Sequence, residues 1–267
     1  MLEAQVMWWD GDEQLRSPLS MQLLRWLQQC EQRAVVIGWG PSEIGVVQAL
    51  AAHAAAIHAS DWAVNMASYA SFYAPLLRQR LPRAASAAAL APQRGKHTVT
   101  FLLSDGDNLQ VKRPLRRGDR NDPRLQWLIG GSFASPANGW WGSSSRGSVA
   151  MGWTVSPAMA ELAPSVLQRF YREASPSDVF VAGPSGVAYT FPDIIANATA
   201  FAGLTMQYMR RADLAIVNVI ADSDCDAECA TPYVRAGAQA VFLYTYGCAL
   251  CPPTCRADSR ACLRCVS

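Results

Sequence analysis

Short apolar runs alternate with helical or polar segments along the whole chain. Seven runs contain mostly β-favouring residues and are apolar at nearly every position: 34–39, 56–61, 98–103, 149–154, 179–184, 214–220 and 240–245. Strands that are apolar on both faces are typical of parallel sheets covered by helices. The alternation therefore predicts an α/β fold.

The number of runs favours one arrangement of the sheet. About seven parallel strands predict an irregular, TIM-like (β/α) barrel, and an open doubly wound parallel sheet is the alternative. An eighth strand either lies before residue 34 or is absent. Between the strands, the pattern predicts one helix over 156–174, with Ser156 as its cap and Pro157 in its first turn, and another over 191–212.

Three parts of the chain differ in composition. Residues 1–33 contain an amphipathic helical segment, and we interpret them as the remnant of an N-terminal region. Residues 34–247 carry the strand pattern and form the α/β domain. Residues 248–267 form a cysteine-rich tail, for which a small zinc site, disulfides in a secreted product and an aberrant terminus all stay open.

Chemically active side chains gather where the predicted strands end. In parallel α/β folds, ligands bind beyond the carboxyl ends of the strands. Carboxylates there can protonate a glycosidic oxygen or activate water, and an indole can stack on a sugar ring. The sequence therefore predicts a carbohydrate site. Its candidate residues at the strand ends are Trp39, Asp61, Asp105, Asp107, Asn108, Trp153, Ser185 and Asp222.

Each candidate also has a structural interpretation. An aspartate at a strand end commonly caps the next helix or forms an Asx-turn, and "SDGDN" (104–108) is good turn chemistry. A tryptophan commonly packs in the core, and the three histidines are expected to be structural or exposed.

Three segments resemble, in order, the signature blocks of the GxGYxYP family, whose members are named as glycoside hydrolases. They are "SDGDN" (104–108), "MGWTVSPAMAELAP" (151–164) and "GPSGVAYTFP" (183–192), and the resemblance covers roughly residues 34–220. It implies a site containing Asp105, Asp107, Asn108, Ser185 and Tyr189. Gly186 is a further predicted substrate-binding residue, because the tight turn around it can bring backbone N–H groups close to a ligand.

The name motif itself is altered at two positions. Gly186, Tyr189 and Pro192 are kept, whereas Ala188 replaces the second glycine and Phe191 the second tyrosine. Ala188 is expected to be strained if the position requires a positive φ angle. Phe191 lacks a hydroxyl that could contact a ligand.

These observations predict a glycoside hydrolase acting on an oligo- or polysaccharide, with Asp105 or Asp107 as one carboxylate and Asp222 as the other. A non-catalytic carbohydrate-binding protein is one alternative. A metal-dependent nucleotide-sugar transferase is another, because Asp-Gly-Asp at a strand end can hold a divalent cation. We expect no cofactor and no resident metal in the hydrolase.

Composition limits the other classes of function. Hydrophobic residues form 51% of the 267 residues and charged residues 16%, which suits a large core. The net charge of +2 does not indicate a nucleic-acid partner. No run reaches the roughly 18 to 20 apolar residues of a membrane span. The start lacks a secretory signal, so the protein is intracellular, or it is secreted and the N-terminus is incomplete.

Overall fold

The computed structural model describes the backbone of most of the α/β region. The described residues are 18–27, 29, 35–40, 42–59, 70–71, 73, 78–79, 99–104, 106, 109, 141–223, 225, 227–245 and 264–266.

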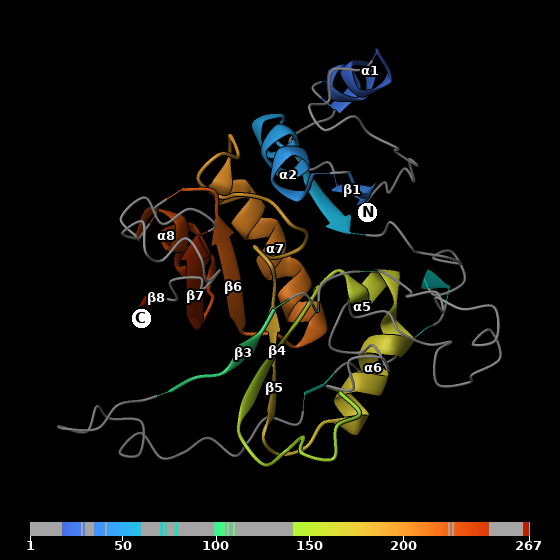
Figure 1. Ribbon diagram of the computed structural model, residues 1–267, viewed down its shortest axis with the longest axis vertical. Helices are drawn as coiled ribbons and strands as arrows, with labels where there is room; N and C mark the ends of the chain where they lie inside the picture. Colours follow the sequence, from blue (N-terminus) through green and yellow to red (C-terminus); the bar gives the residue numbers. More distant parts are fainter. Residues whose placement is uncertain are drawn as a thin grey trace.

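The described strands form two sheets (Figure 1). The smaller sheet pairs β1 (Val35–Gly38) with β2 (Ala56–Ala59) in parallel. The larger sheet has the order β3-β4-β5-β6-β7-β8, in which the first five strands are parallel and the last is antiparallel. Its strands are β3 (Leu102–Leu103), β4 (Met151–Val155), β5 (Asp178–Ala182), β6 (Ile216–Ala221), β7 (Ala240–Thr245) and β8 (Arg264–Val266).

The five parallel strands curl into a half-barrel. The hydroxyl of Ser104, directly after β3, shares a hydrogen bond of 3.0 Å with the hydroxyl of Tyr244 on β7. These strands are separated by three others in the sheet, so the contact requires the sheet to bend round. The bend places the carboxyl end of β3 beside that of β7.

Helices cover the convex face of this sheet. Side chains alternate along each strand, so Trp153, Phe180, Val217 and Val241 all point to one face, where they form the larger hydrophobic cluster. The helices that follow the strands are α5 (Met159–Leu162), α6 (Pro164–Glu173), α7 (Ala198–Ala212) and α8 (Ala227–Ala236). Leu167, Phe201 and Tyr233 from these helices pack in the same cluster.

A second cluster joins the two sheets. It contains apolar side chains of α1 (Pro18–Leu27), α2 (Glu43–Ala52), β1 and β2, together with Tyr189, Phe191 and Ile220. The backbone adds two hydrogen bonds, from the N–H of Ile57 to the carbonyl of Tyr189 at 2.9 Å and from the N–H of Tyr189 to the carbonyl of Ile57 at 2.8 Å. The segment after β5 therefore holds β2 against the larger sheet.

All seven predicted strands are present, but a closed seven-stranded barrel is not confirmed. Among the described residues, β2 meets Tyr189 through an antiparallel bridge and meets Leu109 through one backbone bond of 2.8 Å, instead of pairing with β3. The predicted α/β class is confirmed. The parallel sheet is a five-stranded half-barrel beside a separate pair.

The predicted helix over 156–174 is wrong as a single element. Two helices occupy the segment, and the break lies at Ala163, whose φ of −153° is not helical. Pro164 disfavours the helical conformation at the residue before it and has no N–H to donate, so it begins α6 instead of continuing α5. The helix predicted over 191–212 begins later, at Ala198, where the Asn197 side chain accepts the N–H of Ala200.

The C-terminal part contains a disulfide and a short last strand. Cys225 and Cys229 form a disulfide at the start of α8, and β8 lies within the segment assigned to the cysteine-rich tail. No helix in the described part of the chain has the length and apolarity to cross a membrane.

A buried carboxylate fixes the loop before β4. Asp178, whose side chain is 0% exposed, accepts hydrogen bonds from the Arg146 guanidinium at 2.8 Å, the Trp153 indole N–H at 2.8 Å and the Ser175 N–H at 2.7 Å. Burial opposes the charge, but the Ser175 and Trp153 hydrogen bonds and the Arg146 charge outweigh it, so the pKa of Asp178 is lowered.

Replacing this carboxylate tests its contribution to stability. We expect Asp178→Asn to lower the free energy of unfolding by about 2 kcal/mol at neutral pH, because a charged hydrogen-bond acceptor is lost from the interior. A lowered folded-state pKa means that the contribution is complete above about pH 4 and is lost as the pH falls through the folded value. Urea denaturation between pH 7 and pH 3 measures both effects.

The matched control is Asp213→Asn, which removes the more exposed ion pair with Arg78. We expect it to cost less than about 1 kcal/mol. Equal losses in the two variants would contradict the importance of the Asp178 network.

Candidate functional site

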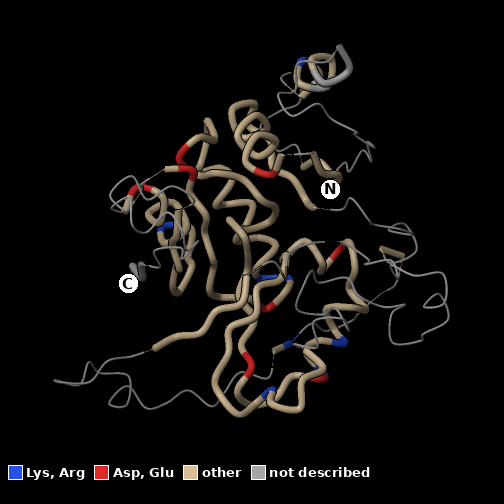
Figure 2. The backbone as a smooth tube through the Cα atoms, in the orientation of Figure 1, with Lys and Arg blue, Asp and Glu red and all other residues tan. Residues whose placement is uncertain are grey.

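Acidic and aromatic side chains from both sheets meet at the carboxyl end of the larger sheet. Figure 2 shows acidic positions where α2 begins and on the loops beyond β6. The described residues at this end include Trp39, Glu43, Gln48, Tyr189, Asp193 and Asp222.

Asp222, predicted as a catalytic carboxylate, directly follows β6 and is held from two sides. Its Oδ1 accepts a hydrogen bond of 2.8 Å from the side-chain amide of Gln48 on α2. Its backbone N–H donates to Asp193 Oδ1 at 3.0 Å, and the next residue, Ser223, donates its N–H and its hydroxyl to Asp193 Oδ2, both at 2.9 Å. Neither Asp193 nor Asp222 forms an ion pair with the described residues. The Asp222 loop therefore has a defined position.

Tyr189 links the family motif to the first sheet. Its hydroxyl donates to Glu43 Oε1 at 3.2 Å, and its ring stacks on Trp39 with 6.3 Å between centroids and 26° between planes. Tyr189 is buried at 4% exposure, whereas Trp39 is half-buried. Trp39 and Glu43 both lie just beyond the end of β1, so the structure brings them to the same edge as Asp222.

The turn that contains Ser185 is attached to β6. Ser185 has a φ of 59°, donates its N–H to the carbonyl of Asn218 at 2.7 Å, and exchanges hydroxyl bonds of 3.2 Å with the N–H and carbonyl of Ile220. The Tyr233 hydroxyl donates to the Ser185 carbonyl at 2.6 Å. Ser185 is fully buried, so its polar groups hold the turn on the sheet.

Gly186 has a packing reason to be glycine. Its φ is +125°, and an added Cβ would overlap the Thr205 hydroxyl and lie 2.6 Å from Thr205 Cγ2. That hydroxyl already accepts the N–H of Val187 at 3.1 Å. The position has neither the space nor the backbone conformation for a side chain.

The two departures from the family motif lie in the interior. The expected strain at Ala188 is absent, because its φ is not among the positive values of the described residues. Its side chain is buried at 2% exposure in the larger cluster. Phe191 is fully buried and packs edge-on against Tyr189, with 5.7 Å between centroids. The phenyl ring fills the core and is not exposed at the surface.

The segment "SDGDN" begins at the same edge. Besides the contact of Ser104 with Tyr244, the N–H of Gly106 donates to the Thr154 hydroxyl at 3.1 Å. The N–H of Leu109 donates to the carbonyl of Ala59, at the end of β2. Four predicted site residues lie outside the described residues: Asp61, Asp105, Asp107 and Asn108.

Trp153 is not brought to this edge. β4 continues to Val155, so Trp153 lies within the strand and points to the helix-covered face, where it is 3% exposed. Its indole donates to Asp178, the first residue of β5, and packs edge-on against Trp141. Trp153 therefore extends towards the opposite end of the sheet.

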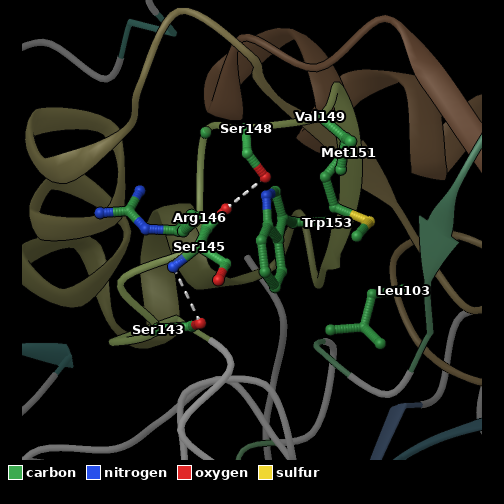
Figure 3. Close-up of a pocket in the computed structure, with 9 residues that line it drawn as sticks. Leu103, Ser143, Ser145, Arg146, Ser148, Val149, Met151 and Trp153 are labelled. Atoms are coloured by element: carbon green, nitrogen blue, oxygen red, sulfur yellow. Dashed lines mark hydrogen bonds between the residues drawn. The ribbon is translucent and has the colours of Figure 1, made fainter.

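Trp153 borders a largely apolar pocket of about 340 Å³ at that opposite end (Figure 3). Leu103, Val149 and Met151 form its apolar wall, and the serines of the loop before β4 lie on its other side. Ser148 donates to the carbonyl of Ser145 at 2.7 Å, which fixes the loop. The described residues that line the pocket include no carboxylate, and the pocket lies away from Asp222.

Two buried polar side chains have no hydrogen-bond partner among the described residues. They are the imidazole of His58 on β2 and the amide of Asn218 on β6, and both are fully buried. Burial lowers the pKa of His58 to about 4, so the ring is neutral at physiological pH. The described residues contain no group of three potential metal ligands.

Glu43, Gln48 and Asp193 were not predicted from the sequence. Asp193 directly follows the motif block "GPSGVAYTFP". Glu43 lies in the first turn of the helix that follows the first strand. Their position beside motif residues was an available signal. Gln48 had none, because its role depends on a contact with a residue 174 positions away.

The fold and this edge define an α/β protein with acidic groups beyond the ends of parallel strands, a framework that commonly carries catalytic and binding sites. Family models identify the chain more closely. The "GxGYxYP putative glycoside hydrolase C-terminal domain" matches residues 95–251, and the "GxGYxYP third domain" matches residues 4–71. The chain belongs to the GxGYxYP family.

A solved structure shares the fold. The crystal structure of a "putative hydrolase from Bacteroides thetaiotaomicron VPI-5482" at 1.25 Å superposes with a TM-score of 0.68 and is 25% identical in sequence. The alignment covers 85% of this chain and 41% of that protein, so this chain spans less than half of its length. No curated protein sequence matches the chain.

A substitution at Gly186 tests the structural role of the motif turn. We expect Gly186→Ala to lower the free energy of unfolding by more than about 2 kcal/mol, because it combines an unfavourable φ with overpacking against Thr205. Gly203→Ala is the matched control. Gly203 lies within α7 with open space around it, so alanine should leave stability unchanged or raise it by about 0.5–1 kcal/mol.

Thermal and urea denaturation of both variants measure the difference. A Gly186→Ala protein as stable as the Gly203→Ala protein would contradict the close packing of the turn.

Proposed function

We propose that the protein hydrolyses glycosidic bonds of an oligo- or polysaccharide, with Asp222 as one of the two carboxylates. The observation that carries the proposal is the fixed position of Asp222. Its side chain and its backbone are each held by a polar contact, at the edge of the sheet where Tyr189 of the family motif also lies. A positioned carboxylate is what general acid–base catalysis at a glycosidic bond requires.

The second carboxylate in this proposal is Asp105 or Asp107. Ser104 and Gly106, the described neighbours of these residues, contact Tyr244 and Thr154. Tyr244 packs in the same cluster as Tyr189 and Ile220, close to the start of the Asp222 loop. This placement supports a pair that acts on one substrate.

The separation of the two carboxyl groups would set the stereochemistry. A separation of about 5–5.5 Å suits a nucleophile and an acid/base in a retaining enzyme, and about 6.5–9.5 Å leaves room for the water of an inverting enzyme. In either case one carboxyl group protonates the leaving oxygen as the bond to the anomeric carbon breaks.

Substrate binding in this proposal involves the aromatic pair. Trp39 is half-buried and stacked on Tyr189, so its indole has accessible surface on which a sugar ring could pack. Asn108 and Asp61 are proposed to bind sugar hydroxyls. Ser185 and Gly186 shape the turn that holds Tyr189 in place.

Replacing the carboxylate of Asp222 tests the proposal. We expect wild-type protein to release reducing sugar ends from at least one glycan in a broad panel. Asp222→Asn should lower kcat at least about 100-fold, because general acid–base or nucleophilic action is lost. The retained amide shape should keep KM within roughly threefold.

Asp213→Asn, at the opposite end of the sheet, is the control and should leave kcat unchanged. Binding of a glycan without any turnover by the wild type would replace the hydrolase with a carbohydrate-binding protein. Turnover that survives Asp222→Asn would exclude Asp222 as a catalytic group.

A further inference from the structure

The hydrogen bond between Gln48 and Asp222 crosses from one family domain to the other. Gln48 lies in the segment matched by the third-domain model, and Asp222 lies in the segment matched by the C-terminal-domain model. The donor is Gln48 Nε2, the acceptor is Asp222 Oδ1, and the distance is 2.8 Å. A proposed catalytic group in one domain is therefore contacted by the other.

The helix that carries Gln48 is itself well fixed. Ser42 caps α2 by accepting the N–H of Gly45 at 3.2 Å, and Val46, Val47 and Leu50 are buried in the second cluster. Gln48 is half-buried on the side of the helix and directs its amide across to β6. Its contact with Asp222 is thus set by the packing of α2, and not by a mobile surface chain.

The contact suits a carboxylate that has to face a substrate. An amide N–H donates a hydrogen bond and cannot take up a proton at ordinary pH, so Gln48 orients Asp222 without competing for its proton. It occupies Oδ1, and Oδ2 has no partner among the described residues. Asp193 meanwhile holds the backbone of the loop. Gln48 fixes one carboxylate oxygen, and the described part of the chain leaves the other without a hydrogen bond.

We infer that Gln48 is a positioning residue that fixes the orientation of the Asp222 carboxylate, so that the reaction site is shared between the third and the C-terminal family domains. This role rests on the proposed function of Asp222. The rival role is a structural tie that holds α2 on the larger sheet and has no effect on the chemistry.

Three substitutions at position 48 separate these roles. Gln48→Met keeps the length and removes the donor, Gln48→Lys keeps a donor, and Gln48→Glu puts a second carboxylate beside Asp222. Gln79→Glu is the matched control, because Gln79 also donates its side-chain amide to an aspartate residue, at the Asp213 carbonyl at the other end of the sheet.

In the full chain, we expect Gln48→Met to lower kcat by about tenfold to hundredfold with KM within roughly threefold, since a displaced catalytic group slows the chemical step more than it weakens binding. Gln48→Lys should recover part of this loss. In Gln48→Glu the acidic limb of the kcat/KM profile should move to higher pH, because two adjacent carboxylates share a proton.

The control variant should shift neither kcat nor the pH profile. A structural tie predicts the opposite result, in which the position-48 variants lose thermal stability but keep the wild-type kcat and pH profile. That result would overturn the inference.

A second measurement does not depend on turnover. Three-bond couplings of Asp222, measured by NMR, report whether its side chain keeps one χ1 rotamer. We expect one rotamer in the wild type and in Gln48→Lys, and averaging in Gln48→Met. If no glycan is hydrolysed but this difference appears, the proposed function fails and the positioning by Gln48 stands. Equal couplings in all variants would overturn the inference even if hydrolysis is observed.

Discussion

The attachment of the segment after β5 to two sheets at once is the constraint on which the site depends. At Ser185 the segment bonds to β6 through its backbone and its hydroxyl. At Tyr189 it bonds to β2 through two backbone hydrogen bonds. Because β2 and the half-barrel do not pair directly among the described strands, this segment sets their relative position.

The same segment also holds acidic groups of the site in place. The hydroxyl of Tyr189 donates a hydrogen bond to Glu43. The carboxylate of Asp193 accepts a hydrogen bond from the backbone of the Asp222 loop. A buried serine hydroxyl, a glycine with positive φ and a buried tyrosine would each be costly to replace, for different physical reasons. The motif therefore acts first as a scaffold. It contributes to the chemistry by positioning other groups.

The sequence was a good guide to elements and a weaker guide to their assembly. Every predicted strand is present, because runs such as 214–220 are apolar on both faces and allow few other structures. Closure of the barrel could not be predicted from such runs, since it depends on which strand edges meet. The bridge between Ile57 and Tyr189 pairs residues that lie far apart in the chain and leaves no local pattern.

The same distinction applies to the site. Trp39 and Asp222 were predicted from their place at strand ends, and Tyr189 from the motif; all three lie at one edge. Trp153 was misplaced for two reasons: β4 continues past it to Val155, and the alternation of side chains along the strand puts its indole on the helix-covered face. The role of Gln48 could not be predicted from the sequence, because only the folded position of α2 brings its amide to Asp222.

The two altered motif positions differ from the preserved ones in what the structure requires of the side chain. Ala188 and Phe191 are buried among apolar neighbours, where the physical demand is volume and shape. Gly186 adopts a positive φ directly against Thr205, and Tyr189 directs a hydroxyl at Glu43. Other residues cannot satisfy these two requirements. The substitutions thus fall where packing can adapt, while the groups that position acidic side chains are retained. Loss of the second motif tyrosine is therefore no argument for loss of the site.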